Sequence, residues 1–182
     1  MSKLLLHTCC APCLTYIYYD LFEFHEIYKE NDEVDIYWYN PNIQPKVEFD
    51  KRLNALKDFC NNKDLNLIVN DEYNLNEFVK GRINDGCNFC YGMRLRKAFD
   101  YAIQNGYDKV MTTLCISPYQ NQAKIKEIID NLAKEYNING VYLDYTSKFR
   151  EGQNMARKEN IYMQRYCGCV FSLDKGKIKG IL

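Results

Sequence analysis

The sequence predicts an α/β fold in which a parallel five-stranded sheet is flanked by helices. Short apolar runs alternate along the chain with amphipathic segments whose apolar residues recur every three or four positions. This alternation is typical of βαβ units, and such units bury a parallel sheet between two layers of helices. Ligands of such sheets bind beyond the carboxyl ends of the strands. We therefore look for functional residues immediately after each predicted strand.

The predicted elements follow from the apolar pattern in chain order. Runs of four to six mostly apolar residues predict strands at residues 3–8, 34–39, 65–69, 109–114 and 141–145. Segments with one apolar face predict helices at about residues 14–28, 49–60, 95–103, 125–136 and 151–159. Asn40-Pro41-Asn42 is a turn signal after the second strand, and Asn105-Gly106 marks a helix end. Residues 70–88 show no clear period and predict a small insertion that bears cysteines.

The composition is that of one globular domain. Apolar residues make up 47% and charged residues 26% of the 182, which argues against disorder and coiled coil. No apolar run approaches the ~18–20 residues that cross a bilayer, and three leucines near the N-terminus are too few for a signal peptide. We therefore expect residues 1–182 to form a single cytoplasmic α/β domain without a membrane partner.

The net charge is zero, because 24 Lys and Arg balance 24 Asp and Glu. This balance excludes a globally basic protein that coats nucleic acid. It leaves room for a local basic patch on a neutral body.

Seven of the nine cysteines fall into three tight groups. In a reducing compartment, grouped cysteines more often bind metal or do redox chemistry than form disulfides. The first group lies where the crevice should open and where a helix N-terminus lowers thiol pKa values. We expect the groups to meet there as metal ligands, the first group also being catalytic. They are Cys9, Cys10 and Cys13 after the first strand, Cys87 and Cys90 before a helix, and Cys167 and Cys169 near the C-terminus.

Simpler interpretations account for some of these cysteines. Two C-x2-C pairs would satisfy a structural zinc site, and Cys10-Ala11-Pro12-Cys13 has the form of a thioredoxin-like dithiol. Seven thiols exceed the four ligands of one zinc ion or one four-iron cluster by three. This surplus favours a cluster with a second metal or with catalytic thiols. We expect Cys60 to pack in the core, and we favour packing over a site role for Cys115.

Five motifs extend in order over nearly the whole chain, from about residue 3 to residue 172. Together they resemble those of the QueH-type epoxyqueuosine reductases. The motifs are His7-Thr8-Cys9-Cys10-Ala11-Pro12-Cys13, Asn40-Pro41-Asn42-Ile43, Cys87-x2-Cys90-Tyr91 with Arg94-Leu95, Thr112-Thr113-Leu114 with Ser117-Pro118-Tyr119, and Tyr162-Met163-Gln164-Arg165-Tyr166-Cys167-Gly168-Cys169.

The resemblance implies the topology of the adenine-nucleotide α-hydrolase group, which includes the PP-loop enzymes (HUP/PP-loop-like). The cysteine loop would stand where those enzymes have a glycine-rich phosphate loop, so ATP chemistry is not expected. The implied activity is the two-electron reduction of epoxyqueuosine to queuosine at the tRNA wobble position, without cobalamin. The implied cofactors are a [4Fe-4S] cluster and an adjacent mononuclear iron. We expect a low-potential electron donor of the ferredoxin or flavodoxin kind.

The chain departs from the family pattern at two places. Met163 stands where the resemblance leads us to expect Arg, and residues 144–149 match the family's Asp-Phe-Arg pattern only loosely. Asp144 follows the last predicted strand, so we expect its carboxylate to face the crevice as an oxygen ligand or proton donor. A turn or a helix cap is the alternative role for this residue.

Substrate recognition should involve an extruded anticodon base, because RNA sequence is read mainly on unstacked bases. Tyrosines beside the motif cysteines are candidates for stacking on such a base, with core packing as the alternative. We expect the tRNA to contact these tyrosines and polar motif residues. The expected substrate-binding set is Asn40, Asn42, Tyr16, Tyr91, Arg94, Ser117, Tyr119, Tyr162 and Gln164.

Phosphate contacts of the tRNA are expected from local basic clusters. A charge run on a solvated helix face is the alternative for each cluster. The clusters are Lys148 with Arg150, Arg157 and Lys158, then Arg94 with Arg96 and Lys97, and Lys175 with Lys177 and Lys179.

Overall fold

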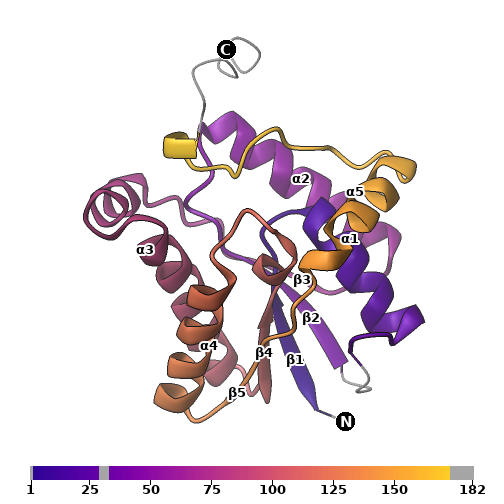
Figure 1. Cartoon of the computed structure of the whole chain (residues 1–182), viewed down its shortest axis with the longest axis horizontal. Coiled ribbons are helices and arrows are strands. Elements are labelled where there is room, and N and C mark those ends of the chain that lie inside the picture. Colours follow the sequence, from indigo (N-terminus) through magenta and orange to yellow (C-terminus); the bar gives the residue numbers. More distant parts are fainter. Residues whose placement is uncertain (1, 29–32, 173–182) are drawn as a thin grey trace.

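A computed structural model describes residues 2–28 and 33–172. Its centre is a five-stranded parallel sheet with the strand order β3-β2-β1-β4-β5, which confirms the predicted fold class (Figure 1). The strands are β1 (Lys3–His7), β2 (Glu33–Trp38), β3 (Leu67–Val69), β4 (Lys109–Thr112) and β5 (Asn139–Val141). None of the helices in the described ranges is long and apolar enough to cross a membrane.

Helices cover both faces of the sheet (Figure 1). The first layer consists of α1 (Ala11–Tyr19), α2 (Lys46–Asn62) and α5 (Phe149–Lys158), and the second of α3 (Leu75–Gln104) and α4 (Gln122–Tyr136). Successive side chains of a strand point to opposite faces. Accordingly, the fully buried Leu4 and Leu6 pack in the first core, whereas Leu5 packs in the second. The central strand β1 therefore joins the two cores.

The first helix is shorter than predicted because a buried carboxylate ends it. α1 stops at Tyr19, one π-helical turn follows over Asp20–Phe24, and His25 adopts a left-handed conformation with φ of 51°. The fully buried carboxylate of Asp20 accepts hydrogen bonds from the backbone N–H groups of Glu26, Ile27 and Tyr28 at 2.8–2.9 Å. These bonds replace the helical ones. Leu21 and Tyr28 are still buried, whereas Phe24 is 43% exposed.

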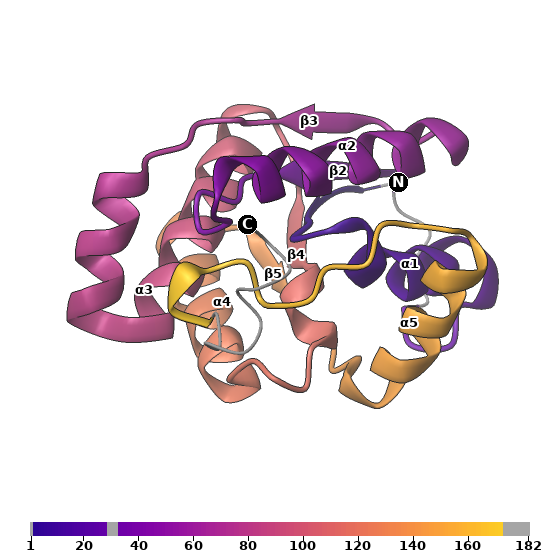
Figure 2. The same cartoon turned by 90° about the horizontal axis from the view of Figure 1, so that it is seen from above.

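The segment predicted to be irregular is mostly helical. α3 begins at Leu75, where the side chain of Asn74 caps the helix by accepting from the N–H of Glu77. The helix is broken at Gly86, whose φ of 61° and ψ of −142° are accessible mainly to glycine. Figure 2 shows α3 as two helical segments joined by a sharp bend. The bend explains the missing period in the sequence and places Cys87 at the start of the second segment.

The last strand and the C-terminal segment complete the fold. β5 spans Asn139–Val141, whereas the predicted strand spanned residues 141–145. The chain then continues through a short 3-10 turn, Thr146–Lys148, into α5. After α5, residues 159–169 cross the molecule toward α3 without regular structure (Figure 2). This crossing brings the last two cysteines back to the carboxyl ends of the strands.

Candidate metal centre

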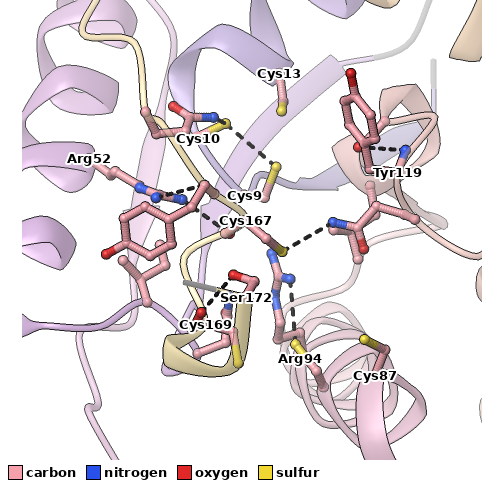
Figure 3. A pocket seen from close by; sticks show the side chains of 18 of the residues that line it. Cys9, Cys10, Cys13, Arg52, Cys87, Arg94, Tyr119, Cys167, Cys169 and Ser172 are labelled. Carbon is pink, nitrogen blue, oxygen red and sulfur yellow. Dashed lines mark hydrogen bonds between the residues drawn. The ribbon is translucent and has the colours of Figure 1, made fainter. Parts of the chain in front are cut away.

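One cavity of about 560 Å³ is lined by all seven grouped cysteines, and all of them are free thiols (Figure 3). We call it the thiol cavity. It opens beyond the carboxyl ends of β1 and β4, as expected for a parallel sheet. Cys60 and Cys115 do not line it and are buried, in agreement with their predicted packing roles. The sequence prediction that the three cysteine groups meet in one crevice is thus confirmed.

The first group is the tightest. The Sγ atoms of Cys9, Cys10 and Cys13 lie within 4.8 Å of one another, between the end of β1 and the first turn of α1. Hydrogen bonds from Cys10 and Cys13, together with the positive charge of Arg94, hold the pKa of Cys9 well below its usual value. Burial raises the pKa of Cys10, and hydrogen bonding to its neighbours raises the pKa of Cys13. Of the three thiols, that of Cys9 is therefore the one most readily deprotonated.

Two side chains at the strand ends fix this loop. Thr113 accepts a hydrogen bond from the backbone N–H of Cys9 at 3.0 Å and donates its hydroxyl to the Cys9 Sγ at 3.2 Å. His7 lies beneath the loop, with Nδ1 2.8 Å from the Thr112 hydroxyl and Nε2 3.3 Å from the Tyr39 carbonyl. Burial lowers the pKa of His7 to about 3, so the ring is neutral. It links three strands without adding charge.

The second group lies on the second segment of α3. Cys87 is exposed and Cys90 is buried. One turn later the buried guanidinium of Arg94 donates to Asn40 Oδ1 at 2.6 Å and lies 3.9 Å from the Cys90 Sγ. Arg94 forms no ion pair with a carboxylate anywhere in the described ranges. A buried charge is costly unless it is compensated, so this site favours negative charge on the sulfurs.

The third group is held by a buried ion pair on α2. Arg52 Nε donates to Glu48 Oε1 at 2.7 Å, and both side chains are almost fully buried. The two remaining nitrogens of Arg52 donate to the carbonyls of Tyr166 and Cys167 at 3.0 and 3.2 Å (Figure 3). Glu48 Oε2 accepts from the Tyr162 hydroxyl at 2.7 Å. We call this arrangement the Arg52 clamp, and it fixes the segment that carries Cys167 and Cys169.

The glycine between these two cysteines is required by the clamp. Gly168 has a φ of 114°, a conformation that side chains rarely adopt. A Cβ atom here would lie 2.9 Å from Arg52 Nη1 and 3.1 Å from Ile43 Cγ1. The Gly168 carbonyl also accepts from the N–H of Gln44 at 2.8 Å. The Cys-Gly-Cys sequence therefore allows the backbone to pass close to the guanidinium.

The donor set of the thiol cavity fits an iron-sulfur cluster. Such clusters are held by cysteine thiolates, and seven thiols converge here from three segments. No carboxylate is among the described residues that line the cavity, whereas four arginines are. A cluster ligated by thiolates carries negative charge, and the arginines are suited to stabilise it.

Six of the nine predicted substrate-binding residues line the thiol cavity. Among them, Gln164 donates from Nε2 to the Cys10 Sγ at 2.8 Å. Tyr119 stands at the opening and is 86% exposed. Asn40 does not line the cavity, but its amide joins Arg94 to the carbonyl of Thr8. The six are Asn42, Tyr91, Arg94, Ser117, Tyr119 and Gln164.

Three predictions need correction, because their side chains are engaged elsewhere. Tyr16 is fully buried between α1 and α5, where it packs edge-on against Tyr145, so it cannot stack on a base. Tyr162 belongs to the Arg52 clamp and does not line the thiol cavity. Asp144 is exposed and does not line the cavity either. It accepts from the N–H and hydroxyl of Thr146 at 2.9 and 2.6 Å, which is the alternative turn-capping role.

Three of the seven described members of the predicted basic clusters are paired with carboxylates. Lys148 pairs with Glu26 at 2.8 Å, Lys97 pairs with Glu72 at 3.1 Å, and Arg96 forms a two-bonded pair with Glu135. Arg94 is buried in the thiol cavity, apart from the other members of its cluster. The cluster of Lys175, Lys177 and Lys179 lies outside the described residues.

Sequence reasoning missed several residues that build the site. Glu48 and Arg52 are four residues apart, a spacing typical of exposed helix pairs, but they share a helix face with Phe49, Leu53 and Leu56. Charged residues on an apolar face were the available signal. Thr113 belonged to a quoted motif but had no predicted role, and Gln44 gave no signal, because the contacts of both residues with the cysteine segments arise only on folding.

The fold and the thiol cavity define an α/β protein with a five-stranded parallel sheet and a candidate cysteine metal centre. Comparison with known proteins identifies its family. The sequence model of the family "Epoxyqueuosine reductase QueH" matches residues 4–175, and this chain belongs to that family.

Proteins named "Epoxyqueuosine reductase QueH" are similar to this chain along nearly its whole length. The protein of Dehalococcoides mccartyi is 33% identical over 173 residues, which cover 93% of this chain and 92% of the relative. That of Thermotoga maritima is 30% identical over 187 residues, with 95% and 91% covered. That of Staphylococcus epidermidis is 32% identical over 192 residues, with 95% and 77% covered.

A solved structure supports the fold. The U34-tRNA thiolase NcsA from Methanococcus maripaludis with its [4Fe-4S] cluster is similar with a TM-score of 0.60 and 17% sequence identity. The match covers 98% of this chain and 63% of the thiolase chain. At this level of identity, the likeness establishes the shared fold alone.

Proposed function

We propose that this chain is a tRNA-modifying reductase that converts epoxyqueuosine to queuosine at the wobble position. The observation that carries the proposal is the convergence of seven thiols on one cavity in a chain of the QueH family. The reaction takes up two electrons and two protons, releases the epoxide oxygen as water and leaves a carbon–carbon double bond. We further propose that residues 1–182 act as one cytoplasmic domain and need no cobalamin.

The proposed cofactors are a [4Fe-4S] cluster and a neighbouring mononuclear iron. The seven grouped cysteines would hold them, since four thiolates suffice for the cluster and three remain. When bound, these metals supply electrons singly and a Lewis acid for the epoxide oxygen. The electrons would come from a low-potential donor of the ferredoxin or flavodoxin kind.

Unsatisfied polar atoms support the proposed recognition of the substrate. Asn42 Oδ1, Gln164 Oε1 and Arg94 Nε are buried and have no hydrogen-bond partner in the described chain. All three residues line the thiol cavity. A buried polar atom without a partner costs about 1–3 kcal/mol, which a substrate with matching donors and acceptors would recover. We assign to them the polar groups of the bound nucleoside.

An aromatic side chain at the opening supports binding of RNA. The exposed ring of Tyr119 is held edge-on by Phe149, with 5.6 Å between the ring centroids and an angle of 85°. A ring fixed in this way offers its face to a base, and stacking on one aromatic side chain is worth about 1–3 kcal/mol. We propose that Tyr119 stacks on a base of the anticodon loop.

Anaerobic purification tests the cofactor. We expect a brown protein with about four sulfides per chain, in line with one four-iron cluster. A colourless protein that contains zinc would replace this proposal with a structural zinc or thiol-redox protein.

Activity is tested by reducing tRNA that carries epoxyqueuosine with dithionite and measuring queuosine by mass spectrometry of the nucleosides. We expect Cys9→Ser with Cys10→Ser to abolish turnover, because these thiols belong to the tightest sulfur group. Cys60→Ala is the matched control, since Cys60 is buried away from the thiol cavity. Full activity of the double variant would refute the role of these thiols.

A further inference from the structure

The thiol cavity concentrates positive charge on a chain whose net charge is zero. Four arginines line it, Arg52, Arg82, Arg94 and Arg165, and no carboxylate is among its described lining residues. Charges of one sign around a concave site reinforce one another and attract ligands of the opposite charge. The lining of the thiol cavity therefore favours the binding of an anionic group in addition to the neutral polar groups of a nucleoside.

The four arginines divide into two pairs. Arg52 and Arg94 lie inside and are engaged, the first in the Arg52 clamp and the second with Asn40 and Cys90. Arg165 is exposed and Arg82 half-buried, so both stand toward the opening. Within residues 2–28 and 33–172, neither forms an ion pair with a carboxylate. Arg165 and the remaining N–H donors of Arg82 are therefore available for an external anion.

The contacts of Arg82 and of the surface cations further separate the arginines at the opening from the other basic residues. The Arg82 guanidinium lies 5.4 Å from the centroid of the Phe171 ring and is hydrogen-bonded to the Cys169 thiol, and these two contacts orient its plane. By contrast, the exposed Arg96 and the half-buried Lys97 and Lys148 are each paired with a carboxylate. The opening of the thiol cavity thus differs from the surface around these paired cations.

We propose that Arg82 and Arg165 bind phosphodiester groups of the RNA strand next to the nucleotide that enters the thiol cavity. The inference rests on the proposed function and assigns to these two arginines a role in RNA binding that the proposed reaction does not itself require. The planar guanidinium matches phosphate oxygens with two parallel hydrogen bonds. An RNA strand fits better than an acidic protein, because Tyr119 at the same opening offers a stacking face that carboxylates do not need.

The test measures binding of an anticodon stem-loop RNA that carries epoxyqueuosine to the anaerobically prepared holoenzyme over a range of salt concentrations. We expect R82Q and R165Q each to weaken binding about tenfold. Each should also reduce the slope of log affinity against log salt by about 0.7, the value for one contact on a single strand. R165K should keep the salt dependence, because it retains the charge, but should lose part of the affinity, because lysine lacks the planar fork.

R96Q is the matched control. It makes the same change in net charge at an arginine that is paired with Glu135 and does not line the thiol cavity, so binding should be unchanged. Iron and sulfide content is measured for every variant, because Arg82 lies on the same helix as two cysteine ligands.

One result would overturn the inference alone, namely that R82Q and R165Q bind the RNA as tightly as the wild-type protein does. If these variants then also show a raised KM for reduced flavodoxin, the arginines belong to a site for a donor protein. If the wild-type holoenzyme itself shows no salt-dependent RNA binding, the proposed function falls and this inference falls with it.

Discussion

Replacing Arg52 by methionine is the sharpest test of how the C-terminal cysteines are positioned. The change keeps the length and apolar character of the side chain but removes the charge that faces Glu48 at 2.7 Å. The side chains of the two residues are only 3% and 6% exposed, so Glu48 would be left as a buried, unpaired carboxylate. Breaking a buried ion pair in this way costs about 3–5 kcal/mol. For a chain of this size the melting temperature should fall by roughly 6–20 °C.

The double variant Glu48→Gln with Arg52→Met separates stability from metal loading. Glutamine keeps an acceptor for the Tyr162 hydroxyl and removes the buried charge, so most of the lost stability should return. The two hydrogen bonds to the carbonyls of Tyr166 and Cys167 stay absent in the double variant. We therefore expect its iron content to remain below that of the wild-type protein.

The assay combines thermal unfolding by circular dichroism with iron and sulfide analysis of anaerobic samples. Arg96→Met serves as the control, because its pair with Glu135 is about half exposed and should contribute at most about 1 kcal/mol. A double variant no more stable than Arg52→Met would show that the buried charge is not the source of the loss. A double variant with full iron content would show that Arg52 does not position Cys167.

Three further outcomes follow from the same structure. Gly168→Ala places a Cβ atom 2.9 Å from Arg52 Nη1 at a positive φ, so the free energy of unfolding should fall by about 1–3 kcal/mol and the iron content should drop. An unchanged free energy of unfolding and iron content would refute the close approach. In metal-free protein at pH 8, iodoacetamide should label the exposed Cys87 well before Cys60, because burial raises the pKa of the Cys60 thiol to about 12 and keeps it protonated. Equal labelling rates of the two cysteines, measured by mass spectrometry, would contradict this prediction. Asp20→Ala removes the acceptor for three backbone N–H groups and should cost about 2–4 kcal/mol in chemical unfolding, whereas a loss below 1 kcal/mol would exclude that role.

The sheet and the meeting of the cysteines were predictable because both follow from chain-local patterns. Apolar runs marked the strands, and the parallel order placed residues after β1 and β4 at one edge. The cysteine group after β1 had to lie there. For Cys167, which follows no strand, the expectation rested on the grouping of the cysteines alone, and the structure shows the crossing segment that brings it there (Figure 2).

The predictions that failed depended on partners distant in sequence. Tyr16 follows the motif cysteines, but α5 covers its side chain. The two elements lie so close that a Cβ atom added at Gly152 of α5 would lie 2.9 Å from the Cβ of Tyr16. Lys148 looked like part of a free basic cluster, yet its carboxylate partner Glu26 is 122 residues away. A sequence shows which residues are charged or aromatic, whereas exposure is decided by what packs on them.

The Arg52 clamp shows why a buried ion pair occurs in this fold. A segment without regular structure crosses the cavity, and its carbonyls find no strand or helix partner. Burial without donors would cost about 1–3 kcal/mol for each carbonyl. A guanidinium has five N–H donors, so Arg52 satisfies two carbonyls and still donates to Glu48. Lysine offers a point charge without this fork, and for that reason an Arg52→Lys variant should keep the pair with Glu48 but hold Cys167 less firmly.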